Sequence, residues 1–120
     1  MLVRLGCCLV LAISVLLPRA AWASCADEIS KLMSKDTEKL TTRYNKVAKQ
    51  AQQHASPKLI QEECRIARQL KPKLEDQIAA LKQSGCIRDP QMGSMVADIM
   101  RGHEDDLAAA NKTAARSECR

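Results

Sequence analysis

Cysteines are the residues of this sequence with the widest range of chemistry, because thiolates bind metals, carry electrons and form disulfides. Redox enzymes and zinc sites place two cysteines close together, as in C-x-x-C. Beyond the apolar N-terminus the cysteines are separated by 38, 21 and 32 intervening residues, and no C-x-x-C-H haem motif occurs. This spacing predicts disulfide-bonded structural cysteines. They are Cys25, Cys64, Cys86 and Cys119.

The N-terminus has the three-part pattern of a secretory signal peptide. Arg4 makes the start positive, residues 5–17 carry no charge, and Ala21-Trp22-Ala23 places small residues at the −3 and −1 positions. The apolar run is shorter than the roughly 20 residues that a membrane-spanning helix needs. We therefore expect residues 1–23 to be a cleaved signal peptide and residues 24–120 to be one mature domain. The protein is expected in the periplasm or outside the cell, without a membrane span.

Cys25 has a second interpretation, as the lipid-modified first residue of a bacterial lipoprotein. That kind of signal carries a leucine-like residue three positions before the cysteine, where this sequence has Trp22. Removal of Cys7 and Cys8 with the signal leaves an even number of cysteines, and lipidation of Cys25 would leave one of the others unpaired. Both observations favour a disulfide at Cys25, with the lipoprotein as the alternative.

A run of methionines ends in a histidine at residues 92–103, and thioether and imidazole groups together suit Cu(I). At 100° per residue, Met92, Met95, Met100 and His103 fall within roughly 140° of arc around a helix. The same arc carries Val96, Ile99 and Leu107, and methionine is an ordinary filler of irregular cores. Core packing is the favoured interpretation and a copper site the alternative. The candidate ligands are Met92, Met95, Met100 and His103.

Other catalytic patterns are incomplete. In H-E-D-D, residues 103–106, a metalloprotease helix would need a second histidine where Leu107 stands. Neither His54 nor His103 has a glutamate three residues before it, as a di-iron bundle requires. The G-x-S-x-G elbow of serine hydrolases is absent from the sequence. We therefore expect a protein that is not an enzyme and has no cofactor.

Six basic residues form a stripe within about 120° of one helix, facing away from its apolar side. They are Lys31, Lys35, Lys39, Arg43, Lys46 and Lys49. The stripe is interpreted either as a solvated outer face or as a contact surface for an acidic envelope protein or an anionic surface. Of the 19 basic residues, Arg4 and Arg19 fall in the signal, so 17 remain against 14 acidic residues, a net charge of +3. This weak charge, with Tyr44 as the sole aromatic residue after the signal, argues against nucleic acid as a partner.

Three segments repeat apolar residues at three- and four-residue steps, which predicts helices over about 27–54, 57–84 and 90–117. Ser56 before Pro57 and Asp89 before Pro90 are typical helix starts, and Gly85 is a typical left-handed end. Pro72 predicts a kink rather than a break, because the apolar stripe stays in phase across it. The stripe of the first helix is expected to comprise Ile29, Met33, Leu40, Tyr44, Val47 and Ala51, with Leu32 off it.

Three helices of similar length joined by short turns predict an all-α, antiparallel up-down-up bundle. In that arrangement Cys25 and Cys86 lie at one end, and Cys64 and Cys119 lie toward the other. The bundle therefore predicts the disulfides Cys25–Cys86 and Cys64–Cys119, because disulfide geometry forbids pairs that span its length. Cys119 would lie about 10 Å beyond Cys64 on a straight helix, so the last turn must fray or fold back.

Together these patterns predict a small exported protein of the cell envelope that binds a partner through a helical, partly basic surface. The alternative function is a periplasmic copper-binding protein. The identity of the partner and the oligomeric state are left open by the sequence.

Overall fold

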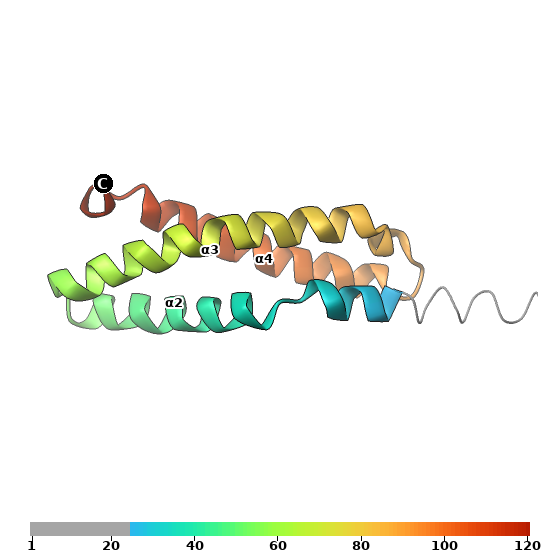
Figure 1. Cartoon of the computed structure of the whole chain (residues 1–120), viewed down its shortest axis with the longest axis horizontal. Coiled ribbons are helices and arrows are strands. Elements are labelled where there is room, and N and C mark those ends of the chain that lie inside the picture. The colour runs from blue at the N-terminus through green and yellow to red at the C-terminus, as the bar shows by residue number, and fades with distance from the viewer. Residues whose placement is uncertain (1–24) are drawn as a thin grey trace, which may run out of the picture.

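The computed structural model describes residues 25–120, and this part of the chain contains helices and turns but no strand. The signal peptide predicted for residues 1–23 lies outside the described residues. A helical segment over 25–32 comes first. The later elements are α2 (Lys35–Gln53), α3 (Pro57–Ser84), the short 3₁₀ helix η1 (Cys86–Arg88), α4 (Gly93–Ala114) and the short 3₁₀ helix η2 (Ser117–Cys119). The absence of strands among residues 25–120 confirms the all-α prediction. Helices α2, α3 and α4 run in alternating directions (Figure 1).

The first predicted helix is not continuous. The 25–32 segment ends before Met33, and α2 begins with Ser34 as its N-cap, whose hydroxyl accepts a hydrogen bond from the Thr37 backbone N–H at 3.5 Å. Two acidic residues in the first turn of α2 complement the positive end of the helix dipole. The break shifts the helical phase, so Leu32 packs against the core and Met33 is 42% exposed. The prediction of one helix over 27–54, with Met33 on its apolar stripe, is wrong at this point.

Helix α3 has the boundaries that its sequence signals predict. The Ser56 hydroxyl accepts a hydrogen bond from the Leu59 N–H at 3.2 Å, and Pro57 occupies the first turn. Gly85 ends the helix in the left-handed region with φ of 74°, which costs a glycine little because it has no Cβ. The helix continues through Pro72, and its axis bends near its middle (Figure 1), as a proline that interrupts one backbone hydrogen bond predicts.

Helix α4 begins three residues after the predicted start. The Asp89 carboxylate accepts hydrogen bonds from the N–H groups of Gln91 and Met92, at 2.8 and 2.9 Å, and the α-helix follows from Gly93. A Cβ at Gly93 would lie 2.5 Å from the carbonyl oxygen of Ile87, so a larger residue there would push η1 away. These contacts place the end of the α3–α4 connection close against the start of α4.

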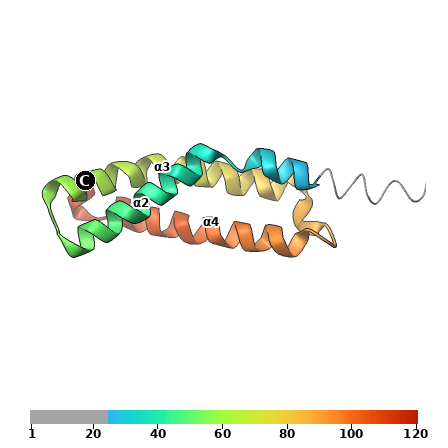
Figure 2. The same cartoon turned by 90° about the horizontal axis from the view of Figure 1, so that it is seen from below.

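Two apolar clusters fill the bundle, one toward each end, and α2 lies obliquely to α3 and α4 (Figure 2). The first cluster draws on α2, α3 and α4 and consists of Tyr44, Val47, Ile66, Ala67, Leu70, Leu74 and Ala110. The second draws on the 25–32 segment, α3, η1 and α4 with the residue before it, and consists of Ile29, Leu81, Cys86, Met92, Val96 and Met100.

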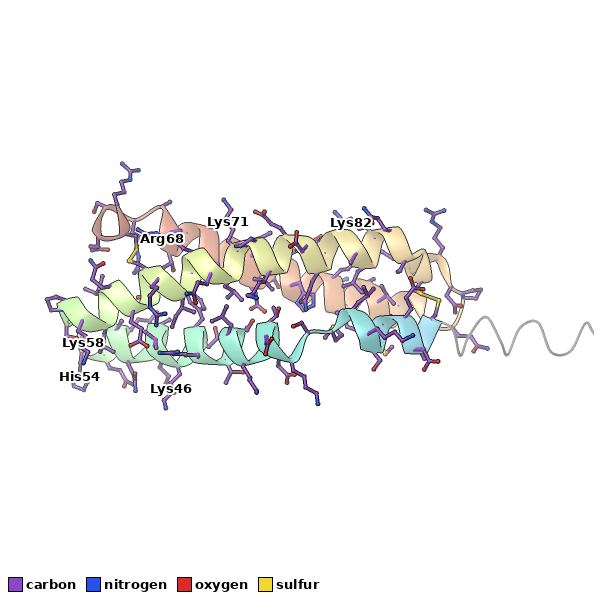
Figure 3. All side chains as sticks on the ribbon, viewed as in Figure 1. Lys46, His54, Lys58, Arg68, Lys71 and Lys82 are labelled. Carbon is purple, nitrogen blue, oxygen red and sulfur yellow. A yellow bond between two sulfur atoms is a disulfide. The ribbon has the colours of Figure 1, made fainter. Side chains whose placement is uncertain are left out.

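Both predicted disulfides are present, one toward each end of the bundle (Figure 3). The Cα atoms of Cys25 and Cys86 are 5.6 Å apart, and those of Cys64 and Cys119 are 5.3 Å apart. The second pair is possible because α4 ends at Ala114 and η2 carries the chain back, as the sequence required. The two bridges close loops with sequence separations of 61 and 55 residues. In the chain-entropy model each contributes about 4 kcal/mol to the free energy of unfolding.

No helix within residues 25–120 combines the length and the apolar character needed to cross a bilayer.

Candidate functional site: a basic surface on α2 and α3

An open groove of about 740 Å³ runs along α2 on the side that meets α3. Its basic lining residues are Lys35, Lys39, Arg43 and Lys46. They share one side of α2 because they recur at three- and four-residue steps. Val47, which is buried in the first apolar cluster, also lines this α2 groove. The groove therefore combines an excess of basic side chains over the carboxylates of Glu38 and Glu62 with one apolar side chain.

Glu62 of α3 lies on the opposite side of the α2 groove and forms an ion pair with Arg43. The same carboxylate lies 3.8 Å from the guanidinium of Arg65, one turn further along α3. Exposed pairs of this kind contribute little to stability, commonly below about 1 kcal/mol. Their effect here is geometric, because Glu62 holds two arginine side chains near the junction of the two helices.

A second hollow of about 540 Å³ lies on α3 and shares Glu62 with the α2 groove. Its basic lining residues are Lys58, Arg65 and Arg68. Figure 3 shows Lys58 and Arg68 on the half of α3 that runs beside α2, and Lys46 on the neighbouring stretch of α2. The α2 groove and this α3 hollow thus form one basic surface, defined by seven residues: Lys35, Lys39, Arg43, Lys46, Lys58, Arg65 and Arg68.

Four of the six residues in the predicted basic stripe belong to this surface. Lys31 lies on the 25–32 segment, across the break from α2. Lys49 is exposed on α2 and does not line the groove. Sequence reasoning missed the contribution of α3, whose Lys58, Arg65 and Arg68 are spaced seven and three residues apart. That spacing is itself a one-sided helical pattern, and a search for basic stripes on every helix would have found it.

The four residues of the predicted copper site lie in three different surroundings. Met92 and Met100 are buried in the second apolar cluster, which agrees with their interpretation as core residues. Met95 is 46% exposed. His103 lines a small cavity that faces the start of α2. This separation does not favour a metal site made from the four together.

His103 is half-buried, and its Nε2 atom has no hydrogen-bond partner among the described residues. Burial lowers the pKa of the His103 imidazole, and the nearby Asp106 carboxylate partly opposes that effect. Burial raises the pKa of Asp106, and the charge of His103 acts in the other direction. Among the described residues, neither His103 nor Asp106 is hydrogen-bonded to a nucleophilic side chain, as a catalytic triad would require.

The four cysteines within residues 25–120 form the two disulfides. Within residues 25–120, no group of three or more histidine, cysteine, aspartate or glutamate side chains converges to hold a metal ion. Comparison of the chain with protein-family models, with curated proteins and with solved structures gives no match. The basic surface is therefore the candidate functional site of the described residues.

Proposed function

We propose that this protein is an exported, non-catalytic interaction protein that binds an acidic segment of a cell-envelope partner through its basic surface. The observation that carries the proposal is the grouping of seven cationic side chains around two adjoining hollows that share Glu62. Such a surface steers an acidic partner toward itself and fixes its orientation.

The shape of the surface favours an acidic protein segment over a lipid headgroup layer. A groove between two helices accepts an inserted helix or strand, which is a common way to recognise a peptide. Val47 and the aliphatic stems of the lysines supply apolar contact within the groove. Lys35, Lys39 and Arg43 are four residues apart, which corresponds to about 6 Å per step along the helix axis. A partner helix with a carboxylate at every fourth position has the same spacing.

A direct test measures binding of a synthetic helical peptide with glutamate at every fourth position, against the same peptide with glutamine. We expect binding of the glutamate peptide alone, and weaker binding at higher salt. Lys39→Gln together with Lys46→Gln should weaken it about tenfold, at about 0.7 kcal/mol for each lost pair. The matched control is Lys73→Gln with Lys82→Gln, because these exposed residues of α3 line neither hollow.

Equal loss of affinity in the two double variants would count against the proposed surface. Binding to vesicles of anionic lipid without binding to the glutamate peptide would replace the protein partner with a membrane surface. Binding to neither probe would remove the basis of the proposal.

We also propose that the mature protein begins after Ala23 and is exported without a lipid anchor. The pattern of residues 1–23 and the two disulfides support this, since disulfides persist in oxidising compartments. The intact mass of protein purified from its own host tests it. A chain that starts at Ser24 is expected, whereas added mass from acyl chains on Cys25 would establish the lipoprotein alternative.

A further inference from the structure

The break before α2 opens a cavity of about 180 Å³ between the start of α2 and the middle of α4. Met33 lies at the break and lines this cavity, as do Glu38 of α2 and both His103 and Asp106 of α4. The volume corresponds to several water molecules, which is room for an ion with part of its hydration shell. None of the seven residues that define the basic surface lines this cavity, although Glu38 and Thr42 line both the cavity and the α2 groove.

Of the hydroxyl groups that line the cavity, those of Ser34, Thr41 and Thr42 already have backbone partners. The Thr41 and Thr42 hydroxyls donate to the carbonyl oxygens of Thr37 and Glu38, at 2.9 and 3.0 Å. His103 differs, because its Nε2 is shielded from solvent and lacks a partner among the described residues. A shielded polar atom without a partner carries a free-energy cost, and a bound group at this position would remove it.

The charge of the residues that line the cavity indicates whether the bound group is an anion or a cation. Two carboxylates, Glu38 and Asp106, line the cavity and no lysine or arginine does, although the whole chain carries a net charge of +5. An anion would be repelled by these carboxylates, whereas a cation would be attracted. The cavity therefore favours a cationic ligand.

The donor atoms narrow the choice of cation. Zinc sites use three or four ligands from histidine, cysteine and carboxylate side chains, and no such group of three converges in residues 25–120. Magnesium and calcium bind through oxygen ligands, and an ion held by the oxygens of this lining would leave the Nε2 atom of His103 without a partner. A thioether with an imidazole instead selects Cu(I), and the cavity is lined by one of each, Met33 at the break before α2 and His103 in α4.

We propose that this cavity binds Cu(I) through the Sδ atom of Met33 and the Nε2 atom of His103, with the Asp106 carboxylate adding favourable charge. This site retains His103 from the sequence-based alternative and replaces its three methionines with Met33, which the helix break brings to the cavity. It is independent of the basic surface and of the acidic partner.

The test is an anaerobic titration of the mature, disulfide-bonded protein with Cu(I), in competition with the chromophoric chelator bicinchoninate. We expect one equivalent to bind, and we expect Met33→Leu and His103→Asn each to weaken binding by at least about tenfold, since even outer-shell changes cost that much. Met95→Leu is the matched control, because Met95 is similarly exposed but does not line the cavity. X-ray absorption of the loaded protein should show a sulfur ligand that Met33→Leu removes.

Met33→Leu keeps the proposal testable if His103→Asn affects folding, because Met33 is exposed and leucine preserves its apolar character. Absence of stoichiometric Cu(I) binding would overturn the site. Binding that survives Met33→Leu unchanged, or that Met95→Leu weakens equally, would also overturn it.

Discussion

The end of the bundle that holds Cys64–Cys119 contains an aromatic residue and several polar links between helices. The Tyr44 hydroxyl contacts the Thr113 hydroxyl and donates to the carbonyl oxygen of Ala109 at 3.2 Å. Arg116 forms an ion pair with Glu63 at 2.8 Å. At the Cys25–Cys86 end, the apolar contacts come from methionine, leucine, isoleucine and valine. A polar link there is a long hydrogen bond from the Gln77 side chain to the Leu32 carbonyl, at 3.4 Å.

This difference shows two ways to hold three helices with few aromatic residues. Directional hydrogen bonds fix the relative positions of α2 and α4 at the Cys64–Cys119 end, because they break when a helix slides. Methionines at the other end adapt their shape to the space available. Adaptable packing also tolerates the break before α2, so the 25–32 segment depends on its disulfide more than on α2.

Loss of the disulfides should have the largest effect and should affect the two ends differently. Replacing all four cysteines with alanine removes about 8 kcal/mol in the chain-entropy model, a large part of the stability of an ordinary domain. We expect that variant to be largely unfolded. Cys25→Ala with Cys86→Ala should instead release mainly the 25–32 segment, because the break uncouples it from α2. Amide hydrogen exchange checks this, and exchange spread evenly over the chain would contradict it.

Truncation of one buried leucine at each end compares the two cores. Leu70 and Leu81 are both essentially inaccessible to solvent. Leu70→Ala should lower the free energy of unfolding by about 4 kcal/mol, and Leu81→Ala by about 3 kcal/mol. The smaller loss is expected because Met92 and Met100 can move into the space near Leu81. Urea denaturation measures both values, and a larger loss for Leu81→Ala would reverse the comparison.

Replacing one or the other partner of the Arg116–Glu63 ion pair should lower the free energy of unfolding by different amounts. Arg116→Met leaves the Glu63 carboxylate, whose side chain is 7% exposed, without its partner, and should cost about 2 kcal/mol. Glu63→Gln should cost less, because the glutamine side-chain oxygen can still accept a hydrogen bond from Arg116 and position 63 then buries no charge. Urea denaturation of the two variants provides the measurement. Equal losses would show that burial of Glu63 does not control the effect.

Removal of one hydroxyl tests the link between α2 and α4 more finely. Tyr44→Phe retains the ring in the first apolar cluster and removes the contacts to Thr113 and Ala109. Because the Thr113 hydroxyl is then left buried without this partner, the expected cost is about 1.5 kcal/mol. Tyr44→Phe with Thr113→Val should recover part of that loss in thermal denaturation. If the double variant is no more stable than Tyr44→Phe, the two hydroxyls do not stabilise the fold as a pair.

The smallest expected effect is a pH dependence from His103. Burial lowers the pKa of His103 in the folded protein below the ordinary value of 6.5, so the unfolded chain binds the proton more readily. Stability should therefore be constant above about pH 6.5 and fall as the pH drops from there toward the folded pKa. Asp106 of α4 and Glu38 of α2 face the same cavity and limit the effect. Thermal melts between pH 5 and 8 should show this decline in the native protein and in His54→Gln, and less of it in His103→Gln.

Much of the fold follows from local sequence signals. Ser56, Pro57 and Gly85 mark the ends of α3 with the geometry that their side chains favour. Helix order and length then determine which cysteines can meet, and this is why both disulfides were predictable. The fold-back of residues 115–119 was also predictable, since Cys119 must reach Cys64.

The break before α2 was not predicted, because Ile29, Met33, Leu40 and Tyr44 fit one helical repeat. The contrary signals were Leu32, which lay off the stripe, and Ser34 followed by acidic residues, which is a typical helix start. The basic surface was predicted for α2 alone, since a helical wheel describes one helix. Its α3 part, and the meeting of Met33 with His103 at one cavity, depend on how helices pack and could not be derived from one helix.

The central claim is that a disulfide fixes each end of a three-helix bundle, and a non-reducing peptide map by mass spectrometry tests it most directly. Native protein is digested without reduction, after free thiols are blocked at low pH to prevent exchange. The account predicts two linked species, one joining the peptides of Cys25 and Cys86 and the other those of Cys64 and Cys119. A peptide that links Cys25 to Cys64 or Cys119, or four alkylated cysteines, would contradict the helix arrangement described.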